Sequence, residues 1–588
     1  MGFMIFSKIG SRASLFVVLT VFIFTCSCSS NNEPGPVKGI TSYNWDISKA
    51  QQVYTGKTFT LKFVADGKWV AASSQSWLKL LTSAGVAGDA LLQVVPVSNA
   101  PATRECELTI TVGTDKVLVK FYQEPSSTAL KDINVALYED KYLRENYLWN
   151  EEYISMEKSF AETYDKYLSN QLLAMKTNVY DQRVSSSGSR YTFSYITKKA
   201  SLKSARVQKE PELSAGFTGL IPVHYQVSGI YTFWVCGVYP DSPADKAGIR
   251  RGTVIRSVNG ENISERNIND KYYELLHPEE AGSLKLTDYD HNEIDLAVEA
   301  LYLNPVIHKE IKNVDSHKIG YLVYRSFEAS FDEELFEVFK EFNAQGVTDM
   351  VLDLRYNGGG HVISANLISS CIAGAACRGK VFTRMRYNDT RMKSLSESDC
   401  IDKFYYDNYS NLNNTSLAAG ALNLTKVYCL VGSATASASE LVINSLRGID
   451  VNVVLIGEQT VGKNVGMEVD EKTVDGADYV FAPITFQSYN AKDFGDYSSG
   501  FAPDYTIDEF GSTGLKPFGS YEEPLFAKAV ELIAGHVPVD ASPVTKSYGE
   551  FGMAVKLNVA ENPAKENPLQ RNMFVYGTRT AADSSTEL

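Results

Sequence analysis

The chain has 588 residues and a formal net charge of −14, with 44% hydrophobic and 21% charged residues. A chain of this length is expected to form several domains, about three to five, each with its own core. The acidic balance argues against nucleic acid as a partner, because affinity for a phosphate backbone comes from clustered lysine and arginine.

The N-terminus predicts export from the cytoplasm. Lys8 and Arg12 precede the apolar stretch ASLFVVLTVFIF, residues 13–24. Basic residues before a short apolar core are typical of a secretory signal peptide, and the core is too short for a comfortable membrane span. We therefore expect residues 1–27 to be a signal peptide.

The residues that follow resemble the cleavage site of bacterial lipoproteins. Cys28 follows a small residue, Ser27, and residues 28–38 form a polar stretch with two prolines, which reads as a linker. The resemblance implies that Cys28 is acylated and that the membrane is a partner through this lipid, because several acyl chains anchor firmly. It places the protein in the cell envelope, at the outer membrane, on its periplasmic or surface face. An ordinary secretory signal is the alternative.

The other cysteines give no sign of a zinc site. They are Cys106, Cys236, Cys371, Cys377, Cys400 and Cys429, and none forms a CxxC pair. Structural zinc sites use paired spacing of that kind. Buried free thiols are the default expectation, with one or two disulfides left open.

Residues 39–124 are predicted to form an Ig-like β-sandwich. Apolar side chains alternate in TFTLKFV and CELTITV, with turn residues between such stretches. The region resembles BACON-type domains, small sandwiches of Bacteroidetes surface and secreted proteins that are often proposed to bind carbohydrate. Under that resemblance Trp69 and Trp77 would stack on a sugar ring. The alternative is that both lie in the core of a spacer domain.

The next two segments differ in their pattern. Residues 129–205 are expected to be helical, because apolar residues recur at helical spacing in LKDINVALYEDKYLRENYLWNEEY and FAETYDKYLSNQLLAM. Residues 206–302 contain a strand, a short helix and a hairpin turn at Asn259–Gly260, in YTFWVCGVYPDSPADKAGIRRGTVIRSVNGENI.

This second segment resembles a PDZ domain. The resemblance implies that an extended polypeptide substrate binds, through its C-terminus, as an added strand. The carboxylate-binding loop would lie in AGFTGL and include Gly216, Phe217, Gly219 and Leu220. A PDZ domain that positions or gates without a ligand of its own is the alternative.

Residues 303–540 predict an α/β core. KIGYLVYRSF, VTDMVLDLRY, KVYCLVG and VNVVLIGEQ are apolar enough for strands of a buried sheet, and DEELFEVFKEFNAQG is predicted to be a helix.

The candidate nucleophile lies in GSATASASELVINSLRG. This stretch follows the strand KVYCLVG, and the helical pattern starts near Ser437. A serine at such a turn lies at the positive end of a helix dipole, and the N–H of Ala438 points into the same space. The competing interpretation is a helix cap, which needs only one hydroxyl. Ser439 is a weaker candidate because it turns away from the helix start.

Two residues are candidates for the base that Ser437 requires. His361 follows the glycine turn NGGG, and Lys463 lies between glycines in GEQTVGKNVG. A lysine is a base near neutral pH only if its pKa falls by ~3 units, which burial can achieve. We favour Lys463 and interpret His361 as structural or substrate-lining. We interpret Asp353 and Arg355 as a pair that holds the core.

Together, DLRYNGGG, TASASE and GEQTVGK resemble the motifs of the carboxy-terminal processing (tail-specific) serine proteases. The resemblance runs from about residue 130 to about residue 540. It implies a ClpP/crotonase-like core with Ser437 as nucleophile and Lys463 as general base. It implies an oxyanion hole formed by the amides of Ala438 and of Gly358 or Gly359, and a reaction that needs no metal and no organic cofactor.

The chain departs from this family around the lysine. Many members carry a glutamine four residues after it, where this chain has Met467, and some carry an acidic residue where it has Gly448. Thr460 or Asn464 could orient the amine instead. The third catalytic residue therefore stays open.

Two segments remain. The tyrosine-rich insert, residues 379–412, is interpreted as a substrate lid or as a solvated loop. The C-terminal extension, residues 541–588, is expected to contain a strand and a flexible end.

As a whole, the sequence predicts a multidomain α+β serine endopeptidase that cleaves extended or unfolded polypeptides outside the cytoplasm. The runner-up is a surface glycan- or peptide-binding lipoprotein with an inactive protease core. A serine esterase, which would hydrolyse small esters and leave unfolded protein intact, is a third hypothesis.

Overall fold

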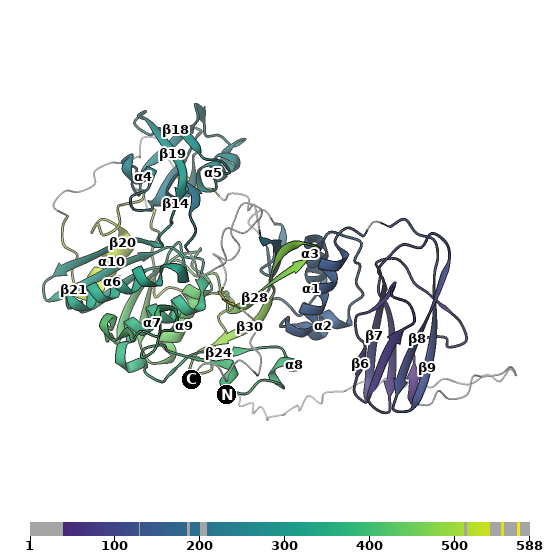
Figure 1. Ribbon diagram of the computed structural model, residues 1–588. Helices are drawn as coiled ribbons and strands as arrows, with labels where there is room; N and C mark the ends of the chain where they lie inside the picture. Colours follow the sequence, from purple (N-terminus) through teal and green to yellow (C-terminus); the bar gives the residue numbers. More distant parts are fainter. Residues whose placement is uncertain are drawn as a thin grey trace, which may run out of the picture.

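The computed structural model describes residues 39–128, 130–184, 188–199, 209–510, 514–540, 554–557 and 573–576. A β-rich N-terminal part lies at one end of the molecule, helices follow, and a large α/β part with a small domain above it forms the other end (Figure 1). The predicted signal peptide, Cys28 and the linker lie outside the described residues.

The N-terminal part consists of two antiparallel sheets that enclose one core. The first sheet has the order β1 (Ile40–Tyr43), β3 (Phe59–Ala65), β7 (Gly88–Pro96) and β5 (Leu78–Leu80). The second has the order β2 (Gln51–Gln52), β9 (Asp115–Gln123), β8 (Arg104–Val112), β4 (Trp69–Ser73) and β6 (Ala84–Gly85), with only β2 parallel to its neighbour. Along β8 and β9 buried and more exposed residues alternate, as strands with one solvated face require.

Both tryptophans considered for sugar binding belong to this core. Trp69 is 3% exposed and Trp77 is 9% exposed, and both pack within the apolar cluster between the sheets. The guanidinium of Arg104 lies 4.2 Å from the centre of the Trp77 ring. Neither indole presents a free face on which a sugar could stack, so the spacer interpretation is favoured over carbohydrate binding.

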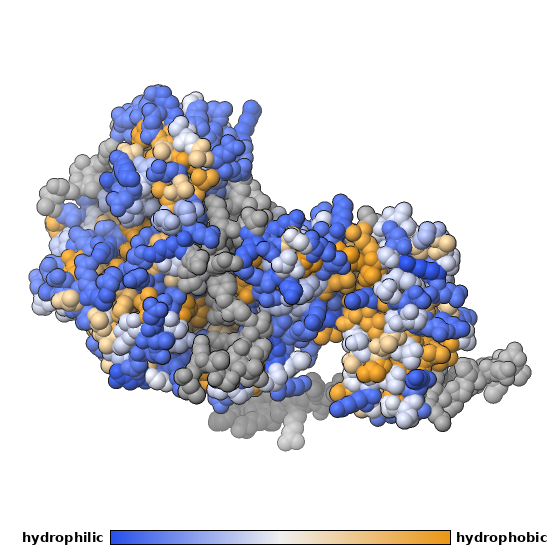
Figure 2. All heavy atoms as spheres, viewed as in Figure 1, coloured by the Kyte–Doolittle hydropathy of each residue, from blue (hydrophilic) through white to orange (hydrophobic). Residues whose placement is uncertain are grey.

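The helical region joins the N-terminal sandwich to the rest of the chain. Its helices are α1 (Ile133–Asn146), α2 (Asn150–Ser155) and α3 (Tyr164–Ala174). A small cluster that includes Val95, Ala136, Phe160 and Tyr167 packs sandwich against helices, and Figure 2 shows apolar surface in this area. Such packing holds the sandwich at a fixed place beside the helices.

The expectation that residues 129–205 are helical throughout is wrong after residue 174. A hairpin of β10 (Gln182–Val184) and β11 (Arg190–Thr192) follows, and then β12 (Tyr195–Lys198) pairs antiparallel with β29 (Ala477–Ala482). The stretch RYTFSYITK is rich in aromatic and β-branched residues, which fit a pleated surface. Its partner lies almost 300 positions away, so the pairing is not visible in the local pattern.

The next domain is an antiparallel sheet with two helices. Its elements are β13 (Glu212–Ser214), β14 (Phe217–Tyr225), β15 (Ile230–Val238), α4 (Pro243–Lys246), β16 (Val254–Val258), β17 (Glu261–Asn262), α5 (Ile268–Leu276), β18 (Gly282–Asp288) and β19 (Glu293–Leu301). The strand order is β13-β19-β18-β16-β15-β14, followed by β32 (Ala554–Lys556) at the edge. The predicted hairpin turn is confirmed, because Asn259 and Gly260 both have positive φ, 54° and 78°.

The α/β core is built on a six-stranded sheet. Its order is β20 (Val306–Val314), β21 (His317–Tyr324), β22 (Asp349–Asp353), β26 (Lys426–Val431), β27 (Asn452–Gly457) and β31 (Tyr505–Thr506), parallel from β21 onward. Helices α6 (Asp332–Ala344), α7 (Val362–Ala373) and α9 (Ala438–Gly448) pack on one face, and α10 (Pro524–Ala534) packs on the other. Helices on both faces explain why these strands are apolar throughout.

A second sheet lies beside this core. It has the order β12-β29-β28-β30-β24-β25, with β28 (Val465–Val474), β30 (Ile484–Tyr489), β24 (Val381–Arg386) and β25 (Ile401–Lys403). Two short strands, β23 (Gly360–His361) and β33 (Met573–Tyr576), pair at its side.

The insert of residues 379–412 contributes two strands to this sheet and the short helix α8 (Asp389–Met392). Its interpretation as a lid or a solvated loop is therefore wrong for β24, where Phe382 and Met385 are buried in the main core. Because the insert is rich in tyrosine, the apolar residues of β24 were not recognised as a buried strand in the sequence.

Two predictions from composition can be compared with the described part of the chain. The six cysteines within it are all buried and free. No described helix has the length and apolar character needed to cross a membrane.

Candidate active site

Three loops of the core leave the carboxyl ends of adjacent parallel strands. The glycine turn follows β22, the serine turn follows β26, and the lysine loop follows β27. Ligands of open α/β sheets bind at this edge, because the loops there converge. The sequence motifs singled out for chemistry therefore meet at one end of the sheet.

Ser437 stands in a strained turn. Its backbone has φ 61° and ψ −112°, a conformation that a residue with a Cβ rarely adopts. The side chain is fully buried, and its Oγ has no hydrogen-bond partner among the described residues. A buried hydroxyl left without a partner costs about 1–3 kcal/mol. The hydroxyl does not serve as a helix cap, so the interpretation as a cap alone is disfavoured.

A buried carboxylate, that of Glu440, joins the serine turn to the lysine loop. Its Oε2 accepts the backbone N–H of Ser437 and that of Lys463, both at 2.8 Å. Its Oε1 accepts the Thr460 hydroxyl at 2.6 Å and the Gly462 amide at 2.7 Å. Burial raises the pKa of this carboxyl, and the four donors counteract the rise. The backbones of the two proposed catalytic residues are thus held within two hydrogen-bond lengths of each other.

Lys463 is buried against an aromatic ring. Its Nζ lies 3.9 Å from the centre of the Phe193 ring, and its exposed fraction is 0%. Burial lowers the pKa of the amine well below its usual range, while the carboxylates of Asp181 and Glu440 partly oppose this. A lysine with this environment is suited to hold a neutral amine, as a general base must.

The segment that covers Lys463 comes from the region before the PDZ-like domain, which sequence reasoning did not connect with catalysis. Asp181 accepts hydrogen bonds from the Tyr147 hydroxyl at 2.7 Å and from the amide and hydroxyl of Ser194 at 2.8 and 2.6 Å. Phe193 directly precedes Ser194, and its amide donates to the Asp181 carbonyl at 2.9 Å. The only feature of the sequence that could have pointed to this contact is the aromatic residue before Ser194. An aromatic residue by itself does not indicate that it packs against Lys463.

Asn357 links the glycine turn to the serine turn. Its carbonyl oxygen accepts the Ala436 amide at 3.2 Å and the Ser439 hydroxyl at 2.9 Å. Its side chain donates to the Tyr324 carbonyl and accepts the Gly359 amide, both at 2.9 Å. Ser439 therefore has a structural role, which agrees with its lower rank as a nucleophile.

The two glycines named for the oxyanion hole differ. The N–H of Gly359 already donates to Asn357, so this residue does not supply an oxyanion donor in the structure. The amides of Gly358 and Ala438 donate to no described residue. Between the two glycines left open by the sequence, the geometry favours Gly358.

The two residues proposed to orient Lys463 have other partners. The hydroxyl of Thr460 donates to Glu440 and accepts the Phe501 amide at 2.7 Å. Asn464 donates through Nδ2 to the Gly495 carbonyl at 2.7 Å. Both hold the lysine loop in place. Met467, where the family usually has glutamine, is fully buried in β28.

His361 is buried behind the glycine turn. Its Nδ1 donates to the carbonyl of Phe327 at 3.0 Å, and burial lowers the pKa of the imidazole to about 4. The ring therefore stays neutral at neutral pH. This supports the structural interpretation of His361.

The four residues named for the PDZ carboxylate loop lie at the start of β14. Phe217 and Leu220 are buried in the domain core, and Gly219 lies opposite Gly237 of β15. The amide of Gly216 donates to the Ser214 hydroxyl at 2.9 Å, so this N–H is not available to a carboxylate. Gly216 has φ 102°, and an added Cβ would lie 2.1 Å from Ser242 Oγ, which explains the glycine.

Arg325 connects this loop to the glycine turn. Its Nε donates to the carbonyl of Thr218 at 2.9 Å, and its Nη1 donates to the carbonyl of Tyr356 at 2.6 Å. Tyr356 immediately precedes Asn357. One side chain thus binds both the PDZ-like domain and the residue before the glycine turn.

The pair of Asp353 and Arg355 is structural, as expected. Their side chains approach to 2.8 Å, and Arg355 also binds Glu523 at 2.7 Å and Glu509 at 3.0 Å. Arg251 of the PDZ-like domain joins the same carboxylate of Glu509 at 2.7 Å. This buried group fixes the domain to the core.

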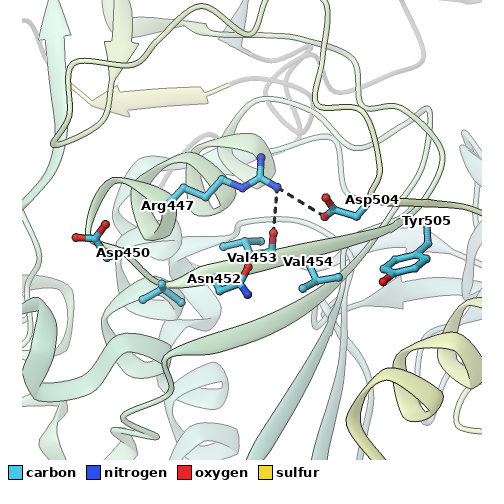
Figure 3. A pocket seen from close by; sticks show the side chains of 8 residues that line it. Arg447, Asp450, Asn452, Val453, Val454, Asp504 and Tyr505 are labelled. Carbon is cyan, nitrogen blue, oxygen red and sulfur yellow. Dashed lines mark hydrogen bonds and ion pairs between the residues drawn. The ribbon is translucent and has the colours of Figure 1, made fainter. Parts of the chain in front are cut away.

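A surface pocket near the C-terminal end of α9 is separate from this arrangement. Figure 3 shows its lining, and Arg447 there donates to the Val453 carbonyl at 3.0 Å and lies 4.0 Å from Asp504. Ser437 precedes the first residue of α9, so the pocket is about 15 Å along the helix from the candidate nucleophile. It takes no part in the catalytic arrangement.

Comparisons with known proteins define the class. Residues 318–507 match the model of peptidase family S41, and residues 234–287 match that of the PDZ domain. An S41 protease structure from Bacteroides fragilis NCTC 9343 superposes with a TM-score of 0.54 and 27% identity, covering 68% of this chain and 97% of that one. These findings support a serine peptidase that carries a PDZ domain.

The curated relatives point to one group within that class. The chloroplastic C-terminal processing peptidase of Tetradesmus obliquus is 25% identical over 285 residues, 46% of this chain and 55% of that protein. The carboxyl-terminal-processing protease of Picosynechococcus sp. PCC 7002 is 24% identical over 301 residues, 50% of this chain and 65% of that protein. The chain thus spans between half and two thirds of these relatives, which support the carboxyl-terminal processing family.

Proposed function

We propose that this chain is a serine endopeptidase of the carboxyl-terminal processing type, which cleaves extended polypeptides with a Ser437–Lys463 dyad. The observation that carries the proposal is the carboxylate of Glu440, which binds the amides of both residues at 2.8 Å. The dry environment of Lys463 and the unpartnered hydroxyl of Ser437 support it.

The reaction follows from the groups present. The neutral amine of Lys463 takes the proton of Ser437 as Oγ attacks the peptide carbonyl. The amides of Ala438 and Gly358 stabilise the negative oxygen of the tetrahedral intermediate, a contribution of roughly 3–4 kcal/mol per donor in comparable sites. The lysine ammonium then protonates the leaving amine. Water hydrolyses the acyl-enzyme by the same proton transfers in reverse order, and neither metal nor cofactor takes part.

Substituting Ser437 by alanine tests the proposal. We expect hydrolysis of unfolded casein and labelling by a fluorophosphonate probe to disappear in Ser437→Ala. The matched control is Ser433→Ala, an exposed serine of the same stretch that should keep both signals. If the wild-type chain cleaves no polypeptide, or if the probe labels another serine, the dyad is wrong. Turnover of small esters without casein cleavage would favour an esterase.

The PDZ domain supports a polypeptide as the substrate, bound through its C-terminus. The link from Thr218 through Arg325 to Tyr356 gives such binding a route to the glycine turn. We infer that the domain both holds the substrate and gates the oxyanion hole.

We also propose that Cys28 carries a lipid anchor in the cell envelope. The support is the sequence alone: an apolar signal core followed by a small residue and cysteine. A cell that expresses Cys28→Ser should release the protein into the soluble fraction and incorporate no labelled palmitate into it, whereas the native chain stays with the membranes. Equal palmitate labelling of the native chain and of Cys28→Ser would show that Cys28 is not the acylated residue.

A further inference from the structure

Two short strands of the C-terminal extension lie on other parts of the chain. β32 pairs with β14 of the PDZ domain, and β33 pairs with β23 and β28 beside the catalytic residues. In Figure 1 the C-terminal strands are yellow, and one of them lies near the label of β28. The predicted extension therefore contacts both places where a polypeptide substrate is expected.

β32 occupies the open edge of the PDZ sheet. It runs antiparallel to β14, with Val555 opposite His224, and the amide of Leu557 donates to the Pro222 carbonyl at 2.8 Å. The side chain of Leu557 packs against the PDZ core. From residue 554 to residue 557 the chain runs toward the start of β14, where the carboxylate loop lies. Addition of a strand to this edge is how PDZ domains bind peptides.

Ion pairing strengthens this contact. Lys556 is exposed but its Nζ lies 2.7 Å from Asp508 and 5.5 Å from the centre of the Phe510 ring. Both partners belong to the segment that leads from the core sheet to α10. The strand therefore touches the PDZ domain with its backbone and the peptidase core with its side chain.

β33 lies between β23 and β28, the two strands that flank the proposed catalytic site. Its residue Met573 is opposite Gly360 on one side and Gly466 on the other, and Phe574 is opposite His361 and Met467. β23 directly follows the glycine turn, and β28 starts two residues after Lys463. Any extended polypeptide in this position would use the same backbone groups. Ser437 itself has no exposed surface.

We propose that β32 and β33 act together as a built-in ligand, in which β32 fills the PDZ edge and β33 fills the substrate seat, so that a substrate must displace them. The statement rests on the proposed function, which identifies the seat. Sixteen positions separate Leu557 from Met573, which allows a reach of up to about 55 Å. Two sites held by one tether bind far more tightly than either alone. If a substrate takes the place of β33, it must be an extended polypeptide that can add a strand parallel to β28.

The test measures binding, so it does not depend on catalysis. The probe is a fluorescent peptide of residues 571–578, RNMFVYGT, added to the full chain carrying Ser437→Ala. The second substitution Phe574→Pro removes a ladder N–H from β33. We expect the probe to bind this double variant about 10- to 100-fold more tightly than the single variant. A probe N-methylated at its phenylalanine should bind neither.

Controls separate this inference from the proposed function. Ala564→Pro lies between the two strands and should leave the affinity for the probe unchanged. Amides of residues 466–469 should exchange with deuterium faster in the Phe574→Pro chain and at the native rate in the Ala564→Pro chain. Equal probe affinity and equal exchange in all variants would overturn the built-in ligand, whatever the activity. Tighter binding in the Ser437→Ala background, together with no casein cleavage by the wild-type chain, would leave the built-in ligand standing and refute the peptidase.

Discussion

Replacing Lys463 by methionine is expected to slow peptide hydrolysis by orders of magnitude and to make the protein more stable. Loss of the base should lower kcat by about 10²- to 10⁴-fold. In the native chain, folding requires the amine of Lys463 to give up its proton or its hydration, because burial lowers its pKa well below the usual range. Methionine has a similar length, needs no hydration, and its sulfur packs well against an aromatic ring such as Phe193. Each kcal/mol gained in the free energy of unfolding should raise Tm by roughly 2–4 °C.

The pH dependence of this gain has a definite sign. In the unfolded chain a lysine has a pKa of ~10.4, and in the folded protein the pKa of Lys463 is lower. Between these two values the unfolded state binds one more proton, so stability rises with pH in this window. The difference in Tm between Lys463→Met and the native chain should therefore shrink as the pH is raised toward ~10.4. The activity of the native chain should rise with pH through the lower value, because only the neutral amine is a base.

Scanning calorimetry and casein hydrolysis, followed as the pH is raised toward ~10.4, measure both effects. Lys472→Met, at an exposed position of β28, is the matched control and should change neither activity nor the slope of Tm with pH. A Lys463→Met protein that melts below the native chain at every pH would show that the amine is charged and paired in the fold. That result would remove the base from the mechanism.

The sequence was sufficient to place the proposed catalytic residues on the fold, because each lies in a local pattern. Ser437 precedes a helix with an apolar stripe, and Lys463 follows a buried strand, so both could be placed on the fold without knowing its topology. Glu440 was not singled out from the sequence, although a serine with glutamate three residues later is the signature of a capping box. It could show only the bond from the glutamate to the serine amide.

What could not be predicted are contacts between segments distant in the sequence. The other three bonds of Glu440 come from residues 460–463, and the ring over Lys463 comes from Phe193, about 270 positions earlier. Asn357 joins two loops through its own backbone carbonyl, which every residue type possesses. The sequence left Gly358 and Gly359 open as oxyanion donors, and only the structure shows that the N–H of Gly359 donates to the side chain of Asn357. Residue type alone carries no information on such partners.

Removing the carboxylate of Glu440 should have the largest structural effect of any single change at the site. Glu440→Ala leaves four buried donors without an acceptor: the amides of Ser437, Gly462 and Lys463 and the hydroxyl of Thr460. Each such group costs about 1–3 kcal/mol, against a total stability of about 5–15 kcal/mol for a domain. We expect Tm to fall by roughly 10 °C or more, with loss of casein hydrolysis and of fluorophosphonate labelling.

Glu440→Gln should be much milder, and the reason is the chemistry of one partner. Its NH2 group can take the place of Oε1, where the Thr460 hydroxyl can reverse and accept a hydrogen bond. Only the Gly462 amide then lacks an acceptor, while the remaining oxygen still holds the amides of Ser437 and Lys463. The glutamine variant should therefore keep measurable hydrolysis and lose about 1–3 kcal/mol. Glu337→Ala, on the exposed face of α6, controls for loss of one negative charge. Equal loss in the alanine and glutamine variants would mean that the negative charge of Glu440, and not its hydrogen bonds, holds the two loops together.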